Sequence, residues 1–231
     1  MDGVLIVDKE KGWTSHDVCA FIRSRFKIAK VGHGGTLDPF ATGVLIILLG
    51  RATKLFNSIA AADKQYFGTM RLGIKTDSHD RDGKVLGEKD WSGTTPEKIE
   101  SVMKRFRGAI EQKPPMVSAL KHKGVRLYQL ARQGKTVERE NRHVVVHQLE
   151  TRDFRFPEVD FFAHVSKGTY LRTLVDDMGE QLGCYAMLNE LRRLRSGDFS
   201  IEDAVTIPQL KQMEIASIGR HVRLGSFAFS L

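Results

Sequence analysis

The sequence predicts an α+β fold, in which helices and loops flank a mixed, largely antiparallel sheet. Strand-like and helix-like segments are intermixed along the 231 residues, without the regular alternation typical of a parallel sheet. Residues 144–165 contain two runs of β-branched and aromatic residues around Pro157 and Glu158, which is typical of a β-hairpin. In other segments apolar residues recur every three or four positions, which indicates helices with one buried face.

The N-terminal segment predicts a strand, a helix and a second buried element. Residues 4–7 form a short apolar run, and Thr14 or Ser15 after it can cap a helix. The apolar run at 44–49 indicates a buried strand or a short buried helix. The helix has an apolar face of Val18, Phe21, Ile22 and Phe26 and a basic face of Arg23, Arg25, Lys27 and Lys30.

The middle of the chain predicts a strand, a helix and a long loop. Residues 67–73 are expected to form a strand, and the polar segment 77–83 a hairpin loop. A possible capping box of Thr94 and Glu97 indicates a helix over the residues that follow. Residues 111–126, rich in Lys and Pro, predict a long basic surface loop of the kind that often contacts ligand.

The C-terminal half predicts two helices and a further strand in addition to the hairpin. Residues 127–131 are typical of a short helix, and a longer helix is expected to open at Lys167. Arg172 falls in the first turn of that helix but outside its apolar stripe, where a helix terminus favours an anion. Residues 188–199 fit a strand or a helix, and we favour the strand because a turn follows at Ser196.

The charge of the chain favours a polyanionic partner. Thirty-six Lys and Arg residues face 28 Asp and Glu, which gives a net charge of +8 and a pI near 9.5. Each phosphate that a protein neutralises releases counterions, so such an excess is typical of nucleic-acid-binding proteins. A basic protein with no nucleic-acid ligand is the alternative that composition leaves open.

The cysteines and the N-terminus indicate a protein of the cytoplasm. Cys19 and Cys184 are far apart in sequence and have no metal-ligand partners nearby, which fits a reducing compartment. Asp2 precedes only a very short apolar run, unlike a signal peptide. No apolar run approaches the ~20 residues that a membrane helix needs, so we expect no membrane association.

The segment from Gly32 to Gly43 concentrates flexible backbone, one titratable ring and one isolated carboxylate. Three glycines before Asp38 let a large substrate approach the backbone closely. Pro39 restricts the backbone of Asp38 to extended conformations, which holds the carboxylate on a stiff bend. This combination indicates a reaction centre.

Two simpler interpretations of the segment from Gly32 to Gly43 remain open on pattern alone, whereas the patterns of a phosphate-binding loop there and of a calcium loop at 77–83 are not met. An Asp-Pro pair in a glycine-rich stretch is often only a turn, and His33 can be a hydrogen-bonded structural residue. A phosphate-binding loop of the nucleotide-hydrolase kind is excluded, because no Lys follows Gly43. The acids of 77–83 lack the alternate spacing and terminal Glu of a calcium loop.

The glycine-rich segment is one of several with unusual residue combinations, and their order is informative. They are Leu5 to Lys9 with Gly12, Thr14 and Ser15; His33 to Pro39 with Ala41 to Leu45; Lys64 to Tyr66 with Leu72, Gly73, Thr76, Asp77, Asp80 and Gly83; Pro115 with Ser118 to Lys121, Gly124 and Tyr128; Lys167 to Arg172; and Leu191 to Leu194. Over roughly residues 3 to 208, their order and spacing resemble the motifs of TruB-type tRNA pseudouridine synthases. Glu10 is a departure, because the family usually has proline there.

The resemblance implies the pseudouridine synthase fold and the isomerisation of uridine 55 in the T-arm loop of tRNA, after base flipping. It implies that Asp38 is the nucleophile, that Tyr66 stacks on the target base as a candidate general base, and that Arg172 pairs with Asp38. It implies substrate contacts by His33, Gly35, Thr36, Lys9, Lys121, Tyr170 and Leu191. The reaction needs no cofactor, and no cluster has metal-ligand spacing, so we expect neither cofactor nor metal.

The end of the chain departs from many members of this family. We expect residues 1–210 to form the catalytic domain and 211–231 a short tail, without a complete C-terminal RNA-binding (PUA) domain. A monomer that binds the T-arm stem-loop through its own basic surface is therefore expected, with salt-sensitive affinity.

Three other functions compete with this hypothesis. A catalytic subunit of a guide-RNA pseudouridylation particle would share the chemistry but normally has further RNA-binding segments. A nucleosidase or base glycosylase with the same residues would release free uracil, whereas isomerisation releases none. A non-catalytic tRNA-folding chaperone would remain active with Asp38 replaced.

Overall fold

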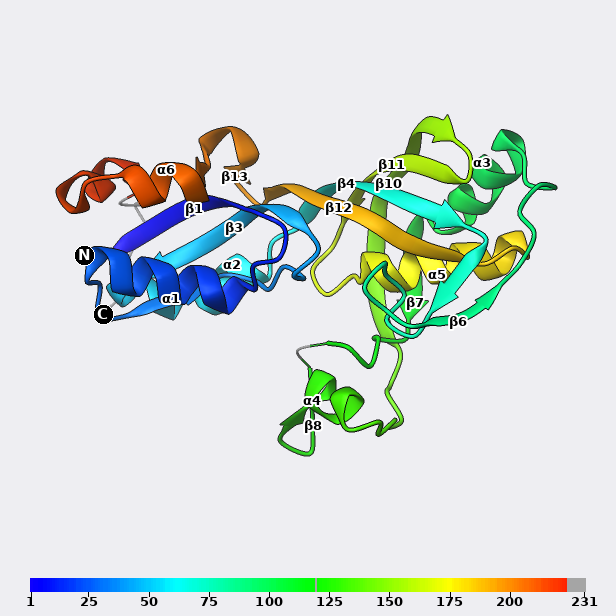
Figure 1. Ribbon diagram of the computed structural model, residues 1–231, viewed down its shortest axis with the longest axis horizontal. Helices are drawn as coiled ribbons and strands as arrows, with labels where there is room; N and C mark the ends of the chain where they lie inside the picture. Colours follow the sequence, from blue (N-terminus) through cyan, green and yellow to red (C-terminus); the bar gives the residue numbers. More distant parts are fainter. Residues whose placement is uncertain (119, 224–231) are drawn as a thin grey trace. The chain divides into compact units, whose positions relative to one another are not determined.

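The structure is a computed structural model that describes residues 1–118 and 120–223 (Figure 1). The chain forms two compact units, the first from residues 1–64 and the chain from Arg192 on, the second from Gln65–Leu191. Strand β12 (Ala186–Ser196) contributes its residues up to Leu191 to the second unit and the remainder to the first. The predicted domain boundary at residue 210 stays a prediction.

The first unit is built around a pair of apolar strands. Strand β1 (Gly3–Lys9) runs antiparallel to β3 (Thr42–Leu49), with Gly3 opposite Leu49 and Lys9 opposite Gly43. The segment at 44–49 is thus a strand, one of the two predicted alternatives. The shorter strands are β2 (Val31–His33) against β3, β13 (Phe199–Ser200) against β12, and β14 (Val205–Thr206) and β15 (Val222–Arg223) against β1.

Both faces of the β1–β3 pair are buried, which explains why these strands are apolar throughout. Because side chains alternate along a strand, Leu5 and Val7 face one core and Val4 and Ile6 the other. The first core is completed by helices α1 (Ser15–Phe26) and α6 (Ile207–Gln212), and the second by α2 (Phe56–Ala60). Three 3-10 helices, Gly50–Leu55, Ile201–Asp203 and Ile215–His221, connect these elements.

Helix α1 begins at the capping residue that the sequence predicts. The Thr14 hydroxyl accepts from the Asp17 N–H at 3.0 Å, and the Asp17 carboxylate accepts from the Thr14 N–H at 2.9 Å. This reciprocal pair satisfies two backbone donors that the first helical turn otherwise leaves free. The helix ends at Lys27, which has left-handed backbone angles with a φ of 55°.

The second unit contains the predicted hairpin and a largely antiparallel sheet in the order β12-β4-β11-β10-β7. Strands β10 (Arg142–Arg155) and β11 (Glu158–Val165) form the hairpin around Pro157. Strand β7 (Gly108–Gln112) pairs antiparallel with β10, and β4 (Lys64–Leu72) lies between β12 and β11. The α+β class and the mixed sheet are confirmed, since β12 pairs in parallel with β3.

Helices and two small hairpins complete the second unit. Helices α3 (Pro96–Arg105) and α5 (Leu171–Leu182) pack against each other, and α3 also contacts β10 (Figure 1). The small hairpins are β5 (Ile74–Thr76) with β6 (Val85–Glu88), and β8 (Lys121–His122) with β9 (Val125–Arg126), which precedes α4 (Leu127–Arg132).

Three expectations for the second unit were wrong in detail. The cap of α3 is Thr95, whose hydroxyl accepts from the Lys98 N–H at 3.4 Å, and not Thr94. The segment 111–126 is not one loop, because it contains the end of β7 and the β8–β9 hairpin. Arg172 is buried rather than outside the buried stripe, because it is hydrogen-bonded within the unit.

In the described part of the chain, no helix is long and apolar enough to cross a membrane.

Candidate active site

The glycine-rich segment of the first unit is a loop whose two ends are fixed in the sheet. It leaves β2 at His33, which is opposite Ile47 of β3, and the Gly34 N–H donates to the Ile46 carbonyl at 2.8 Å. Within the loop, the Ala41 N–H donates to the Asp38 carbonyl at 3.1 Å, which closes a tight turn through Pro39. Asp38 therefore sits at the start of a turn on a loop that returns directly into a buried strand.

Ser15 fixes the residue that precedes Asp38. Its hydroxyl accepts a hydrogen bond from the Leu37 N–H at 2.9 Å and donates to the Leu37 carbonyl at 3.1 Å. Both main-chain groups of Leu37 are thus bonded to one side chain in the first turn of α1. Leu37 is itself buried, so helix α1 fixes the backbone of the loop at the residue before Asp38.

Lys9 fixes the residue that follows Asp38. Its side chain is fully buried, and its ammonium donates to the carbonyls of Glu10, Trp13 and Pro39 at 3.0, 2.8 and 3.2 Å. Burial lowers the pKa of Lys9 to about 8, while the negative charge of Asp38 acts in the opposite direction. With these carbonyls as partners, the ammonium holds the turn around Asp38.

Arg193 of β12 fixes the glycines at the start of the loop. Its guanidinium donates to the carbonyls of Val44, Thr36 and Gly35 at 2.6, 3.3 and 3.4 Å, and the residue is only 2% exposed. A side-chain carbon at Gly43 would overlap the Arg193 backbone, and Gly43 has a φ of +100°. The close approach of β12 to the loop therefore requires glycine at this position.

Tyr66 lies in the second unit, on strand β4. It is 8% exposed and points to the same face of the strand as Gly68 and Met70, because alternate residues share a face. A side-chain carbon at Gly68 would overlap the ring of Phe161 on β11. Gly68 thus makes room for an aromatic ring beside the strand that carries Tyr66.

Arg172 is held in the first turn of α5 by three partners. Its guanidinium donates to the carbonyls of Ser78 and Val117 at 3.0 and 2.7 Å, and it forms an ion pair with Asp80 at 3.4 Å. The side chains of Arg172 and Asp80 are 4% and 7% exposed. This is a buried pair with further hydrogen bonds, unlike an exposed surface ion pair.

Gln112 fixes the backbone at the start of the same helix. Its side-chain amide donates to the Tyr170 carbonyl at 3.3 Å and accepts from the Tyr170 N–H at 3.0 Å. Tyr170 caps α5, and Gln112 is 2% exposed at the end of β7. The second unit thus uses the same device as Ser15, one side chain bonded to both main-chain groups of one residue.

Comparison with known proteins decides the family. A model of the N-terminal domain of TruB family pseudouridylate synthases matches residues 23–171. A model of the C-terminal domain of tRNA pseudouridylate synthase B matches residues 172–222. The chain belongs to the TruB family. It is therefore an enzyme of the isomerase class, a pseudouridine synthase, with the pseudouridine synthase fold.

Named relatives of this TruB-family chain cover most of its length. It is 46% identical over 213 residues to tRNA pseudouridine synthase B of Geobacter sulfurreducens, which covers 92% of this chain and 70% of the relative. It is 43% identical over 222 residues to tRNA pseudouridine synthase B of Opitutus terrae, covering 96% and 92% of the two chains.

A solved structure has the same fold. A chain in the crystal structure of a Cbf5–Nop10–Gar1 complex has a TM-score of 0.71 and 34% identity to this chain. The match covers 90% of this chain and 53% of the solved one, so the TruB-family chain spans about half the length of that protein.

The predicted site residues of this TruB-family chain are divided evenly between the two units. Lys9, His33, Gly35, Thr36 and Asp38 belong to the first unit; Tyr66, Lys121, Tyr170, Arg172 and Leu191 belong to the second. Lys121 lies in the β8–β9 hairpin opposite Arg126, and Leu191 is buried in β12. The pairing of Arg172 with Asp38 stays a prediction.

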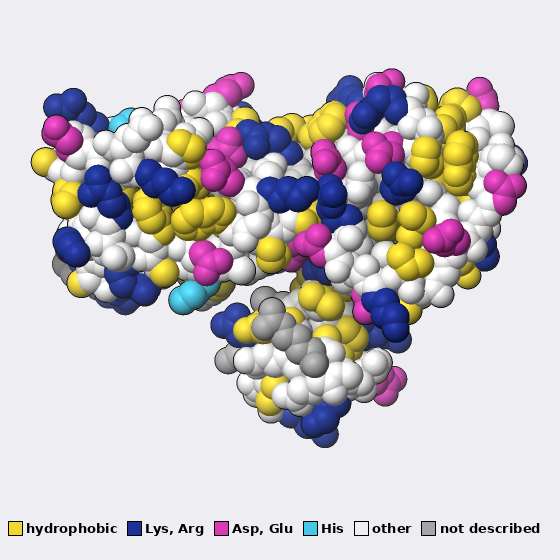
Figure 2. Space-filling model, in the orientation of Figure 1, with side chains coloured by type: hydrophobic (Ala, Val, Ile, Leu, Met, Phe, Trp, Pro, Cys, Tyr) yellow, Lys and Arg dark blue, Asp and Glu magenta, His cyan; other side chains and the backbone are white. Residues whose placement is uncertain are grey.

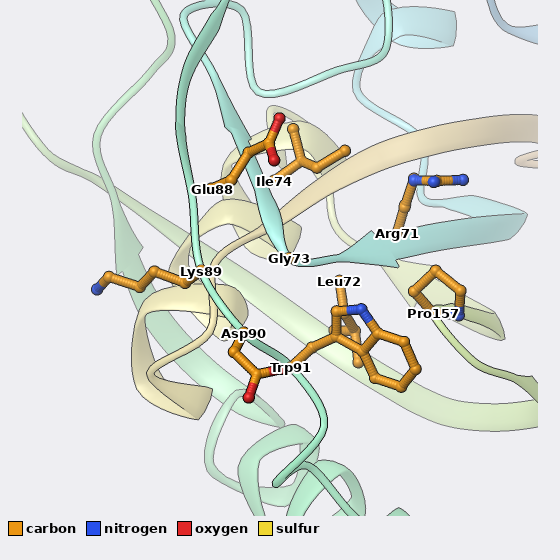
Figure 3. A pocket seen from close by; sticks show the side chains of 9 residues that line it. All are labelled: Arg71, Leu72, Gly73, Ile74, Glu88, Lys89, Asp90, Trp91 and Pro157. Carbon is orange, nitrogen blue, oxygen red and sulfur yellow. The ribbon is translucent and has the colours of Figure 1, made fainter.

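A pocket of about 430 Å³ in the second unit contains none of these residues (Figure 3). It lies where β4 ends, with Arg71 and Trp91 among its lining residues. Arg71 forms an ion pair with Glu158 at 3.5 Å, and the Trp91 ring stacks on Phe156. Tyr66 is not among the residues that line this pocket, although Leu72, which does line it, shares a face of β4 with Tyr66.

Sequence reasoning missed three residues that hold the site. Ser15 was predicted as a possible helix cap and as part of a motif, Arg193 as part of a motif, and Gln112 only as part of a surface loop. Their partners are main-chain groups of residues far away in sequence, which no local pattern reveals. The sequence does not show which polar residues are buried, so no sequence signal distinguishes Gln112 from its polar neighbours.

Proposed function

We propose that this enzyme converts uridine 55 in the T-arm loop of tRNA to pseudouridine, with Asp38 as the nucleophile. The observation that carries the proposal is the loop around Asp38, which Ser15, Lys9 and Arg193 hold on three sides. The relatives named tRNA pseudouridine synthase B support tRNA as the substrate. The position within tRNA rests on the sequence motifs.

The reaction exchanges one bond for another without a change in oxidation state. The bond between C1' of the ribose and N1 of the base breaks, the base turns, and C1' is rejoined to C5. C5 then loses its proton and N1 gains one. An ionised carboxylate at Asp38 can attack C1' or take a ribose proton to give a glycal. In either route the carboxylate stabilises an electron-poor sugar.

The charges in the first unit suit a carboxylate that must remain ionised. The Lys9 ammonium interacts electrostatically with Asp38, and Arg193 brings a second positive charge to the same loop. Both cations are buried and donate to carbonyls of the loop and its neighbours, so they are pre-oriented before any substrate binds.

We assign the remaining roles to the second unit. Tyr66 stacks on the flipped base and takes the C5 proton, and Arg172 pairs with Asp38 and fixes its orientation. Extruding a base from a folded loop costs a few kcal/mol of stacking energy. Contacts between the enzyme and the flipped nucleotide offset this cost. Those contacts are assigned to His33, Gly35, Thr36, Lys9, Lys121, Tyr170 and Leu191.

Release of tritium from tRNA labelled at C5 of uridine tests the proposal, because C5 loses its hydrogen only when it bonds to C1'. Wild-type protein is expected to release tritium, and Asp38→Asn to bind tRNA with similar affinity yet release none. Asp198→Asn, at an exposed turn, is the matched control and is expected to behave as wild type. Turnover by Asp38→Asn, or release of free uracil by the wild type, would contradict the proposal.

One observation favours a second candidate, catalysis within a guide-RNA particle. A solved chain with the same fold, at a TM-score of 0.70 and 29% identity, belongs to an H/ACA RNP bound to a substrate RNA. Tritium release by the purified protein, without any guide RNA or partner, distinguishes the two functions. The tRNA-specific enzyme is expected to act alone.

A further inference from the structure

The second half of helix α1 and the segment after it carry several cations and no acidic residue. Between Asp17 and Asp38 the sequence contains no acidic residue, while it contains Arg23, Arg25, Lys27 and Lys30. The proposed catalysis uses none of these four cations. The run therefore calls for a separate explanation.

The exposed face of α1 forms a stripe that starts at the catalytic loop. His16 and Arg23 are exposed and lie within about 20° of each other around the helix axis, since each residue turns by about 100°. Lys27, the left-handed residue at which the helix ends, is exposed as well. At about 1.5 Å per residue, the stripe extends roughly 16 Å along the axis. Its first residue is next to Ser15, which is bonded to Leu37 beside Asp38.

Positive charge continues past the end of α1 to Lys30. Lys30 is exposed and directly precedes β2, which ends at His33. Dark-blue Lys and Arg side chains are visible over α1 and near α6 in Figure 2. Within the first unit, positive charge thus follows a path that leads away from the loop of Asp38.

These cations differ from Arg152 and Arg155 on β10 of the second unit, which form ion pairs with acids. There Arg152 pairs with Glu150 at 3.1 Å, and Arg155 with Asp153 and Asp160. In the described part of the chain, Arg23, Lys27 and Lys30 form no ion pair; Arg23 donates to the Val31 carbonyl at 3.1 Å. Their positive charge is therefore available to an anionic partner.

We infer that the exposed face of α1 with Lys30, formed by His16, Arg23, Lys27 and Lys30, binds the phosphate backbone of the substrate RNA beside the target uridine. The inference rests on the proposed function, since it takes RNA as the substrate. Long, exposed, unpaired cations in a row suit phosphates better than bases, because they contribute charge without a fixed hydrogen-bonding pattern. They would set affinity and salt dependence rather than the rate of the chemical step.

The triple variant Arg23→Gln, Lys27→Gln, Lys30→Gln tests this surface. Its control is Lys98→Gln, Lys104→Gln, Arg105→Gln, which removes the same charge from exposed positions of α3 in the second unit. The dissociation constant for tRNA is measured by fluorescence anisotropy over a range of salt concentrations, and the single-turnover tritium release at saturating protein. The double variant Lys27→Gln, Lys30→Gln avoids the Arg23 bond to Val31 if the triple variant does not fold.

The triple variant is expected to bind tRNA at least tenfold more weakly at low salt. The slope of log affinity against log salt should become shallower by about 2–3, because each lost phosphate contact contributes 0.7–0.9. Its single-turnover rate at saturation should stay within about twofold of wild type. An unchanged slope, or an equal change in the α3 control, would overturn the inference. If wild-type protein releases no tritium, the proposed function is wrong. The salt dependence of binding then still tests whether this surface binds RNA phosphates.

Discussion

The hydroxyl of Ser15 is bonded to both main-chain groups of Leu37, the residue before Asp38. Lys9 acts in the same way on the carbonyl of Pro39, the residue after it. A single hydrogen bond contributes only about 0.5–1.5 kcal/mol, but an unsatisfied buried partner costs about 1–3 kcal/mol. At the scale of residues, the main effect of Ser15 and Lys9 is therefore to position the Asp38 carboxylate, and their contribution to stability is smaller.

Ser15→Ala is expected to lower both stability and activity. Two buried main-chain groups of Leu37 lose their partner, so the free energy of unfolding should fall by about 1–3 kcal/mol. Single-turnover tritium release should fall about tenfold or more, because a misplaced reacting group is costly. Ser24→Ala, at an exposed position of the same helix, is the control. Full activity in Ser15→Ala would show that the contact does not position Asp38.

Lys9 gives the stability of the protein a predictable pH dependence. Its pKa is about 8 in the folded protein against an ordinary value of 10.5, because burial disfavours the charged form. Between these values the unfolded chain binds more protons, so this group makes the folded protein more stable as pH rises. The difference in unfolding free energy between wild type and Lys9→Met should therefore rise over this window.

Urea unfolding at several pH values measures this difference, and Lys11→Met, at an exposed position, is the control that should give a flat line. A difference between wild type and Lys9→Met that does not change from pH 8 to 10.5 would mean that the ammonium is not destabilised by burial.

At the scale of elements, the loop between β2 and β3 depends on how closely β12 approaches it. Gly43 lies opposite Lys9 of β1 and also pairs with Arg193 of β12. Its positive φ and the lack of space for a side-chain carbon are independent reasons for glycine. The loop and strand β3 after it therefore both depend on the absence of a side chain at Gly43.

Gly43→Ala separates these two reasons when it is compared with Gly108→Ala. Gly108 has a φ of +90° but open space around it, so alanine there should cost about 1 kcal/mol of stability. Gly43→Ala should cost more, about 3 kcal/mol or above, because the overlapping backbone of Arg193 must move. Thermal unfolding of both variants measures the costs, and equal losses would contradict the steric interpretation.

The elements themselves could largely be predicted from the sequence. Helical periodicity predicted α1 and α5, because one buried face imposes a regular apolar pattern. A continuous apolar run predicted β1, and runs of β-branched and aromatic residues predicted the β10–β11 hairpin. It failed for Arg172, since a buried charge with hydrogen-bond partners looks like a surface residue in any hydropathy pattern. The β8–β9 hairpin was missed because its strands are only two residues long.

At the scale of the whole molecule, the candidate site could be predicted only through resemblance to a family. Lys9 lies 30 positions from its partner Pro39, and Arg193 lies 158 positions from its partner Gly35. Such contacts join side chains to carbonyls that every residue has, so composition and spacing cannot reveal them. The net charge of +8 predicted the class of partner but not where it binds.

The central claim is that this chain alone isomerises one uridine of tRNA through Asp38. Carbodiimide-based mapping of pseudouridine in unmodified tRNA, incubated with wild-type protein or with Asp38→Asn, tests it most directly. We predict one modified position, uridine 55, with the wild type and none with the variant. Modification at other positions only, no modification by the wild type, or modification by Asp38→Asn would contradict the claim.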